Sequence, residues 1–371
     1  MKKLFLGALA IATMVACAKE DVISQNNEAI GFKQAFVDNS VRSVVDPSFS
    51  NTNLFSSFAV YGTVENAPLF NKVEVTGSGL EDTGSWTYEG TQYWIAGAKY
   101  NFAAIAPYAK GVAGAFSVVK NSATGAGQPT FVGKTNLNDY VNDDTDLLYA
   151  QSTEIPGQLS GNQKVAFTFR HTLSKVKFSF ENAYNASNAT IAVRDIKIAN
   201  AYNLADVELT ATTTAWSNPE GSKSIFFGDV TLDTASGDYD DATTDVQKPA
   251  EVKYAYNNTY ESFYERLIIP TVDALTKKTY QIEFTVDLYV NNVLVASYDR
   301  TVANGKNATV EFAPQPGCSY DIAAKITATN IDPTHAQEPI QFTVTTITGW
   351  DESNKDQNAN VPEVYTDYQG E

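Results

Sequence analysis

Apolar and polar side chains alternate over residues 280–290, with an apolar side chain at every even-numbered position. A repeat of two residues places these side chains on one face of a β-strand. Asn291 and Asn292 then lead into a second run, residues 293–302. Asparagine tolerates the positive φ angles of tight turns. The segment therefore predicts an antiparallel hairpin with one buried face.

The same alternation recurs between stretches rich in Gly, Asn, Asp, Ser and Thr. It is found at residues 58–64, 100–104, 165–169, 320–326 and 340–350. Strands at this density, without helical periodicity, predict an all-β chain made of antiparallel β-sandwiches.

The phase of the alternation changes once in a way that marks a boundary. Apolar side chains fall on odd positions in residues 165–169 and on even positions in residues 176–180. A slip of one residue turns every side chain to the opposite face. We therefore expect the chain to change sheets between His171 and Ser174, and we place a domain boundary there.

The N-terminus has the pattern of a secretory signal, residues 1–16. Lys2 and Lys3 precede an apolar run, residues 4–15, that is too short to span a bilayer. The ending, residues 14–17, resembles a bacterial lipobox. This resemblance implies cleavage before Cys17 and attachment of acyl chains such as palmitate to that residue, and several acyl chains anchor a protein stably. The alternative is an ordinary signal peptide with an incidental cysteine.

The segment that begins at this cysteine, residues 17–27, is expected to be a tether. Its residues 18–21, Ala-Lys-Glu-Asp, resemble the signal that directs lipoproteins of Bacteroides-like bacteria to the outer face of the outer membrane. The alternative interpretation is a tether whose charged residues only keep it solvated and carry no targeting signal. About 355 residues remain after the signal, which favours two domains.

Charge and cysteine content limit the partners and the covalent chemistry. The formal net charge is −17, which makes nucleic acid a poor partner. The two cysteines are Cys17 and Cys318, so lipid on Cys17 would leave no disulfide within the chain. No run of 18 apolar residues occurs, and we expect only the lipid to hold the membrane.

Catalytic and metal-binding patterns are weak. His171 and His335 are the two histidines, and a histidine within a β-run, such as His171, is more often structural than catalytic. The acidic clusters at residues 139–146 and 238–245 lack the pattern of an EF-hand and are interpreted as solvated loops. We expect no enzyme activity, no cofactor and no metal.

Several motifs occur in an order that resembles the fimbrillin family, the lipoprotein pilins of Bacteroides-like bacteria. They are SWTY at 85–88, YW at 93–94, YNFAAIAPY at 100–108, DLLYA at 146–150, FTFRHTLSKV at 167–176 and TGWD at 348–351. The resemblance implies two tandem transthyretin-like β-sandwiches, residues 28–171 and 172–350. It also implies a pilus or fimbrial subunit that contributes to adhesion.

In polymerising members of that family, an Arg-specific surface protease removes the first strand and opens a groove. A strand from the C-terminal region of another pilin subunit fills this groove, which is β-strand addition. In this chain Ile30, Phe32 and Phe36 would belong to the removable strand, although Gly31 and Gln34 weaken the pattern.

The resemblance places the cut between Arg42 and Ser43. Arg42 is the only arginine before Arg170 and lies in a polar stretch. The alternative is an exposed arginine in a protein that is never processed.

The C-terminal tail, residues 351–371, is a candidate donor segment. A donor strand should have apolar side chains at i, i+2 and i+4, whereas Val361, Val364, Tyr365 and Tyr368 do not share one face. This departure favours a tip or anchor subunit, or a non-polymerising surface lipoprotein that binds a glycan or host protein.

Aromatic side chains gather in residues 86–94, where Trp86, Tyr88, Tyr93 and Trp94 stand close together in sequence. They suit either packing inside the first domain or contact with a glycan, and packing is the favoured interpretation.

Overall fold

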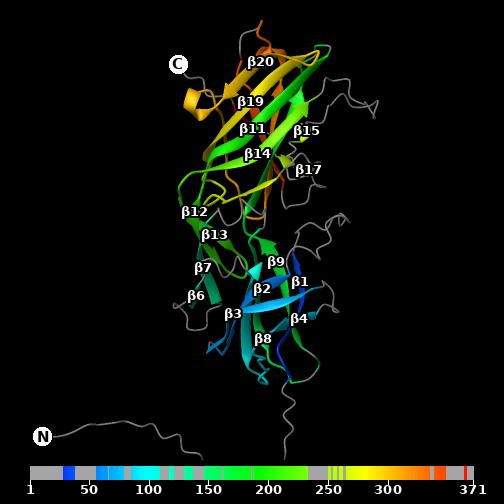
Figure 1. The fold of residues 1–371 in the computed structure, drawn as a ribbon. Helices are drawn as coiled ribbons and strands as arrows, with labels where there is room; N and C mark the ends of the chain where they lie inside the picture. Colours follow the sequence, from blue (N-terminus) through cyan, green and yellow to red (C-terminus); the bar gives the residue numbers. More distant parts are fainter. Residues whose placement is uncertain are drawn as a thin grey trace, which may run out of the picture.

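The chain is built almost entirely of β-strands in the computed structural model (Figure 1). The structure describes residues 28–37, 56–65, 67–78, 85–108, 117–120, 129–136, 146–159, 161, 163–184, 186, 188–232, 250–251, 254–256, 259–261, 265–334, 338–347 and 363–365. Within these residues two short helical turns, η2 (Val302–Asn304) and α3 (Ala328–Ile331), interrupt the strands. The prediction of an all-β chain is confirmed.

Seven strands form a barrel, called the barrel below, which occupies the lower half of Figure 1. Its ladder runs β1-β4-β3-β2-β5-β8-β9 and closes on itself. The strands are β1 (Gly31–Val37), β2 (Ser57–Val64), β3 (Ala67–Ser78), β4 (Ser85–Tyr88), β5 (Lys99–Ala106), β8 (Leu148–Pro156) and β9 (Lys164–His171). The sequence predicted two antiparallel sheets here. The ladder closes instead because β1 pairs in parallel with β9 and antiparallel with β4.

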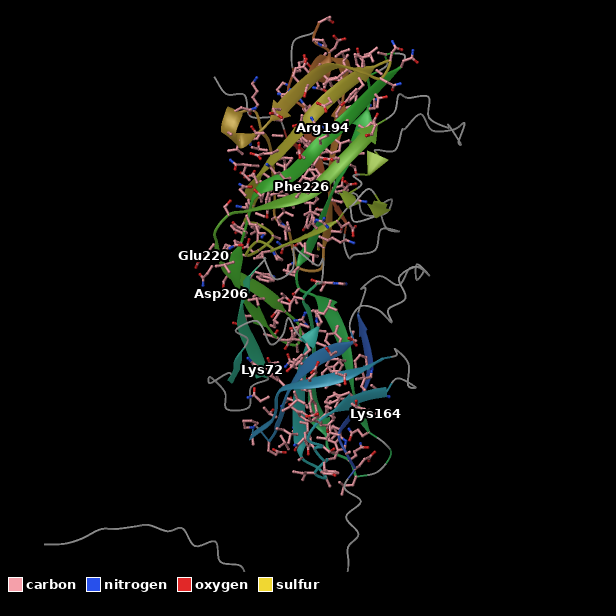
Figure 2. The ribbon with its side chains drawn as sticks, viewed as in Figure 1. Lys72, Lys164, Arg194, Asp206, Glu220 and Phe226 are labelled. Atoms are coloured by element: carbon pink, nitrogen blue, oxygen red, sulfur yellow. The ribbon has the colours of Figure 1, made fainter. Side chains whose placement is uncertain are left out.

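A second sheet, called the bridging sheet, has the order β13-β12-β7-β6. Its strands are β6 (Ser117–Lys120), β7 (Pro129–Asn136), β12 (Leu204–Leu209) and β13 (Thr214–Glu220). Two of these strands precede residue 172 and two follow it, and β12 pairs with β7 along its whole length. Figure 2 places Asp206 and Glu220 of this sheet beside the junction of the upper and lower parts.

The bridging sheet covers one outer face of the barrel. Ala205 and Val207 of β12 share a core with Tyr61 of β2 and Ile105 of β5. Strands β2 and β5 are therefore buried on both faces, since their other side chains point into the barrel core. The alternation expected at residues 58–64 and 100–104 is therefore wrong for residues 58–61 and 102–106, which are continuously apolar because both faces of these strands are buried.

The upper part, called the second unit, consists of two sheets that face each other across one core (Figure 1). One contains β10 (Ser174–Asn182), β15 (Ala250–Glu251), β18 (Arg266–Ile268), β22 (Ser319–Ile326), β23 (Phe342–Ile347) and β24 (Glu363–Tyr365). The other contains β11 (Ala189–Ala201), β14 (Lys223–Leu232), β19 (Lys278–Val290), β20 (Val293–Arg300) and β21 (Ala308–Phe312). A small ribbon pairs β16 (Tyr254–Tyr256) with β17 (Thr259–Glu261).

Aromatic rings join the two sheets of the second unit. Phe178 of β10 meets Phe227 of β14 edge to face, with ring centroids 4.8 Å apart. Phe284 of β19 meets Phe342 of β23 with centroids 5.6 Å apart. Such pairs stabilise the core beyond the area they bury.

The predicted hairpin is confirmed. Strand β19 runs to Val290, Asn291 and Asn292 form the turn with φ angles of 52° and 63°, and Val293 pairs with Val290. The predicted change of sheet is also observed, because β9 ends in the barrel at His171 and β10 begins in the second unit at Ser174.

Candidate functional site: the first strand and its seat in the barrel

Strand β1 is the element that closes the barrel. Its parallel register with β9 runs from the pair Gly31 and Lys164 to the pair Val37 and Phe169. On its other side Phe32 pairs with Trp86 of β4. Because no other strand joins β4 to β9 in this ladder, the closure depends on β1.

The first two apolar residues predicted for this strand are core residues. Ile30, just before β1, and Phe32 within it are each 1% exposed. The ring of Phe32 lies in a pocket of aromatic rings, with centroid distances between 5.5 and 6.2 Å. The pocket residues are Phe58, Phe70, Tyr88, Phe102 and Phe167.

Polar contacts fix the start of β1 against the loop between β4 and β5. The Ile30 amide donates to the carbonyl oxygen of Gln92 at 2.8 Å, and the Trp94 amide donates to the carbonyl oxygen of Glu28 at 3.0 Å. The Tyr88 hydroxyl donates to the Ile30 carbonyl oxygen at 2.8 Å. The entry of the chain into the barrel is therefore held by hydrogen bonds to residues 88–94.

Gln34 is accommodated by an irregularity in the strand. The register with β9 shifts between Lys33 and Ala35, which leaves Gln34 as an extra residue in β1. The shift pairs Phe36 with Thr168, a solvent-facing position of β9. The side chain of Phe36 lies outside the described residues, so its place in the core stays a prediction.

Trp94 is buried at the same end of the barrel. It is 2% exposed, and its indole nitrogen donates to the Gln163 carbonyl oxygen at 3.2 Å. Its ring meets Tyr100 edge to face. Trp94 is therefore a packing residue, which is the interpretation that the sequence favoured for this aromatic group. Its neighbour Tyr93, in contrast, is 49% exposed.

Two predicted modification sites fall outside the described residues. They are the lipidation site, Cys17, and the processing site between Arg42 and Ser43. The other arginines of the chain, at positions 170, 194, 266 and 300, all lie within the strands β9, β11, β18 and β20. Arg42 follows β1 by five residues.

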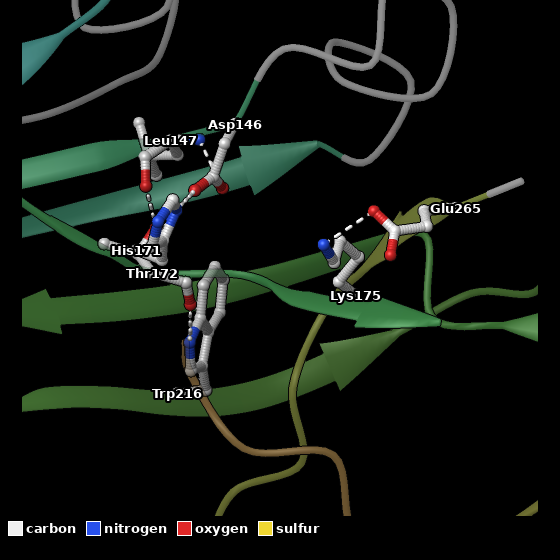
Figure 3. A network of polar contacts seen from close by, with 7 residues as sticks. All are labelled: Asp146, Leu147, His171, Thr172, Lys175, Trp216 and Glu265. Atoms are coloured by element: carbon white, nitrogen blue, oxygen red, sulfur yellow. Dashed lines mark hydrogen bonds and ion pairs between the residues drawn. The ribbon is translucent and has the colours of Figure 1, made fainter. Parts of the chain in front are cut away.

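A polar network holds the junction between the barrel and the second unit (Figure 3). His171 Nδ1 and Asp146 Oδ2 lie 2.5 Å apart, and both side chains are 9% exposed. Burial raises the pKa of Asp146, and its hydrogen bond and charge interaction with His171 oppose this shift. His171 thus has the structural role expected of a histidine in a β-run.

The same network ties the bridging sheet to the junction. The Thr172 hydroxyl donates to the carbonyl oxygen of Leu147 at 2.7 Å, and the indole of Trp216 donates to the carbonyl oxygen of Thr172 at 3.0 Å. Lys175 forms an ion pair of 2.6 Å with Glu265.

Arg170 is a contact residue that the sequence did not reveal. Its guanidinium donates to the carbonyl oxygens of Thr210, Ala211 and Thr213, at 2.6, 3.0 and 2.6 Å. It also lies over the ring of Tyr149, 4.9 Å from the centroid. The β12–β13 turn is therefore fastened to β9. The polar residues 210–214 predict a turn, but they do not predict its contact partner. That partner is Arg170, about forty residues earlier in the chain.

Three residues of the C-terminal tail form a strand. Strand β24 pairs antiparallel with β23 at the edge of its sheet, with Tyr365 opposite Phe342 and Glu363 opposite Val344. The predicted donor segment thus contains a strand that is seated on its own chain. The other tail residues lie outside the described part.

Metal and membrane features are few in the part of the chain that the structure describes. There, no group of three or more His, Cys, Asp or Glu side chains is placed to hold a metal ion. In the same ranges no helix combines the length and apolar character needed to cross a membrane.

These elements define an all-β protein in which the first strand closes a barrel that is joined to a second β unit. A model of the fimbrillin-like family matches residues 42–350, and the chain belongs to this family. None of the curated proteins matches it.

Solved structures that the chain resembles come from Bacteroides and Parabacteroides species. A fimbrial protein from Bacteroides vulgatus has 16% sequence identity and a TM-score of 0.56, covering 88% of this chain and 100% of that chain. Candidate cell adhesion proteins from Parabacteroides distasonis and Bacteroides uniformis have 9% and 14% identity and TM-scores of 0.47 and 0.43. Each covers 88% of this chain and 98% of its own. At 16% identity, the likeness to the Bacteroides vulgatus protein concerns the fold alone.

Proposed function

We propose that the chain is a surface lipoprotein that serves as a pilus or fimbrial subunit, assembles by protease-triggered strand exchange and contributes to adhesion. The observation that carries this proposal is the position of β1. It closes the barrel, places Ile30 and Phe32 in the core, and precedes Arg42 by a few residues. Family membership supports the same role.

Removal of β1 would change the barrel in a way that suits strand addition. Strands β4 and β9 would each lose a hydrogen-bonded neighbour, and the aromatic pocket around Phe32 would open. An unpaired edge beside a hydrophobic groove binds an extended segment, with backbone hydrogen bonds for affinity and side-chain pockets for register. The partner would be a donor strand from another pilin subunit.

The positions of the arginines favour a single processing site. A protease binds its substrate in an extended form that is free of other pairing, and the four arginines in β9, β11, β18 and β20 are held in ladders. We propose that an Arg-specific surface protease cuts between Arg42 and Ser43 and releases the strand that contains Ile30, Phe32 and Phe36.

The remaining parts of the proposal follow the sequence. Residues 1–16 are the signal peptide, and lipid on Cys17 anchors the tether, residues 17–27, in the outer membrane with the protein on the cell surface. Residues 28–171 and 172–350 form two tandem transthyretin-like sandwiches. The two facing sheets of the second unit support the second sandwich only. The first unit closes as a barrel, and β12 of the second range pairs with β7 of the first. The family suggests a structural protein and not an enzyme.

A second candidate function is a non-polymerising surface lipoprotein that binds a glycan or host protein. The observation in its favour is β24, which is already paired with β23 of its own chain. The same observation fits a tip or anchor subunit whose tail, residues 351–371, donates to no neighbour.

Treatment of the purified chain with an Arg-specific protease tests the proposal. We expect a product that begins at Ser43, followed by fibres in electron micrographs. Arg42→Gln should abolish both, whereas Lys306→Gln makes the same change of charge at an exposed loop and should abolish neither. A chain that stays intact, or a cut product without fibres, would favour the second candidate.

A further inference from the structure

Strand β9 is the wall of the β1 seat that has the weaker support from its own sheet. Six of its eight residues pair with β1, whereas two, at the junction end, pair with β8. Along the rest of β9, the Ser152 hydroxyl of β8 donates to the carbonyl oxygen of Ala166 at 2.6 Å. The opposite wall, β4, differs because each of its four residues pairs with β3. Removal of β1 would therefore leave β4 inside a ladder and most of β9 without a paired strand in the described barrel.

The free end of β9, away from the junction, is held by loop contacts. The Trp94 indole nitrogen donates to the carbonyl oxygen of Gln163, the residue before β9. The loop between β8 and β9 also adjoins the loop between β4 and β5, because the Gly97 amide donates to the carbonyl oxygen of Gly157 at 3.0 Å. Neither contact involves β1, so both can persist without it.

Arg170 holds the other end of β9 to a closed turn. Besides its bonds to the carbonyl oxygens of the β12–β13 turn, its Nε donates to the Thr214 hydroxyl at 3.2 Å. The turn is closed because the Thr210 amide donates to the carbonyl oxygen of Thr213 at 3.0 Å, and the two hydroxyl oxygens lie 2.6 Å apart. Four acceptors therefore face one guanidinium, which suits the planar fork of arginine.

The strands that carry this turn rest on a part of the barrel that does not pair with β1. Val207 of β12 and Trp216 of β13 are buried and share a core with Tyr61 of β2 and Ile105 of β5. Strands β2 and β5 pair with each other, and β12 pairs with β7. The support for Arg170 therefore does not depend on β1.

We infer that Arg170 and the β12–β13 turn form a brace that keeps β9 in place as one wall of the groove when β1 is absent. The inference deepens the proposed strand exchange and rests on it. Arg170 is then a positioning residue for the added strand. A strand that enters the groove meets an edge that is already extended, so its binding does not pay the conformational entropy of ordering β9.

Without the brace, the open barrel would populate states in which β9 leaves its place at the edge. Binding then requires the fraction of molecules with β9 in place, and the apparent Kd rises in inverse proportion to that fraction. If fewer than about one molecule in ten keeps β9 in place, the Kd rises at least about tenfold. In the uncut chain the six pairs with β1 hold β9 as well, so loss of Arg170 should disturb the closed barrel less.

Release of the β1 fragment from a nicked chain measures this effect. In residues 17–371 with Cys318→Ser, Cys17 is the one thiol and carries a fluorescent label. A recognition sequence for a protease that cleaves after glutamine replaces residues 39–45, so that the cut does not depend on Arg42. After the cut, fluorescence polarisation over a dilution series gives the Kd of the labelled fragment.

Arg170→Ala should raise this Kd at least about tenfold. Arg194→Ala is the matched control, because it also removes a guanidinium from a short ion pair, with Asp287, but in the second unit (Figure 2). It should change the Kd by less than about twofold, since the two sites share no contact. Urea denaturation of the uncut chains checks that both variants fold. Should Arg170→Ala fail to fold, Arg170→Lys carries the test, with an expected rise of about threefold or more, because lysine lacks the planar fork.

An unchanged Kd in the Arg170 variants, or an equal rise in Arg194→Ala, would overturn the inference. The expected rise in Kd, together with a parent chain that forms no fibres after treatment with an Arg-specific protease, would keep the brace and reject the proposed assembly. Fibres from the parent chain together with an unchanged Kd in the Arg170 variants would do the reverse.

Discussion

The ring of Phe32 stacks on the ring of Phe167, with centroids 5.8 Å apart and planes 15° from parallel. Phe167 belongs to β9 and Phe32 to β1, so the two rings couple the last strand of the barrel to the first. The contact depends on the parallel register, which sets Phe32 beside Val165, two residues before Phe167 on β9. Core packing in the barrel thus depends on a strand of seven residues near the N-terminus.

Phe32→Ala should destabilise the barrel by about 3–5 kcal/mol, because the substitution leaves a cavity among five aromatic rings. Chemical denaturation would measure the free energy of unfolding. Tyr93→Ala, at a half-exposed ring in the loop after β4, should change it by about 0.5 kcal/mol or less. Equal losses in the two variants would contradict the core role of Phe32.

Arg170→Ala should detach the β12–β13 turn from β9. The guanidinium makes charge-assisted hydrogen bonds to three carbonyl oxygens, so we expect a loss of about 1.5–3 kcal/mol in unfolding free energy. Arg170→Lys keeps the charge but not the planar fork, and its loss should be intermediate. Hydrogen exchange should show faster opening at the amide of Thr210 than in the parent. A Lys variant as stable as the parent would reject the clamp.

The strands of the second unit were largely predictable from local pattern. The alternation at residues 280–290 gives β19, whose even positions from Tyr280 to Leu288 are buried. The pair Asn291 and Asn292 gives the turn, because a two-residue hairpin needs positive φ angles. The phase change near His171 marks the change of sheet. Each signal lies within a dozen residues of the feature that it predicts.

The closure of the barrel and the bridging sheet were not predictable in this way. The parallel pairing of β1 with β9 joins residues more than 130 positions apart, such as Phe32 and Val165. Strand β12 pairs with β7 across the predicted boundary at residues 171 and 172. Alternation specifies which face of a strand is buried but not its neighbour, and both pairings are set by tertiary packing. Gln34 shows the same limit, since a bulge accommodates it.

Gly157→Ala adds only one methyl group, but it should clearly destabilise the end of the barrel. A Cβ at Gly157 would lie 2.1 Å from the Ile95 carbonyl oxygen, a backbone atom that cannot turn aside. We expect a loss of about 1–3 kcal/mol in unfolding free energy and of the hydrogen-exchange protection at the Gly97 amide. Gly97→Ala, where a Cβ meets nothing within 4 Å, should cost about 1 kcal/mol from its φ of 74° and keep the two loops together. Retained protection in Gly157→Ala would contradict the close approach.

Asp287 should make stability depend on acid pH. Its carboxylate is 2% exposed and accepts hydrogen bonds from Arg194 and Ser297, at 2.5 and 2.6 Å. Burial alone would raise the pKa of Asp287, but these hydrogen bonds and the charge of Arg194 outweigh it and lower the pKa below its ordinary value. The stabilisation is therefore full above the unfolded pKa of about 3.9 and is lost as pH falls through the lower folded pKa.

Asp287→Asn should consequently cost about 1–3 kcal/mol in unfolding free energy at neutral pH, and this difference from the parent should shrink below about pH 4. Urea denaturation at a series of pH values would measure it. Asp195→Asn is the matched control, because that side chain is 63% exposed and lies 3.7 Å from Arg194. Its cost should be about 0–1 kcal/mol, as for other exposed ion pairs. A difference for Asp287→Asn that stays constant from pH 7 to pH 2 would show that its carboxylate is not the group that titrates.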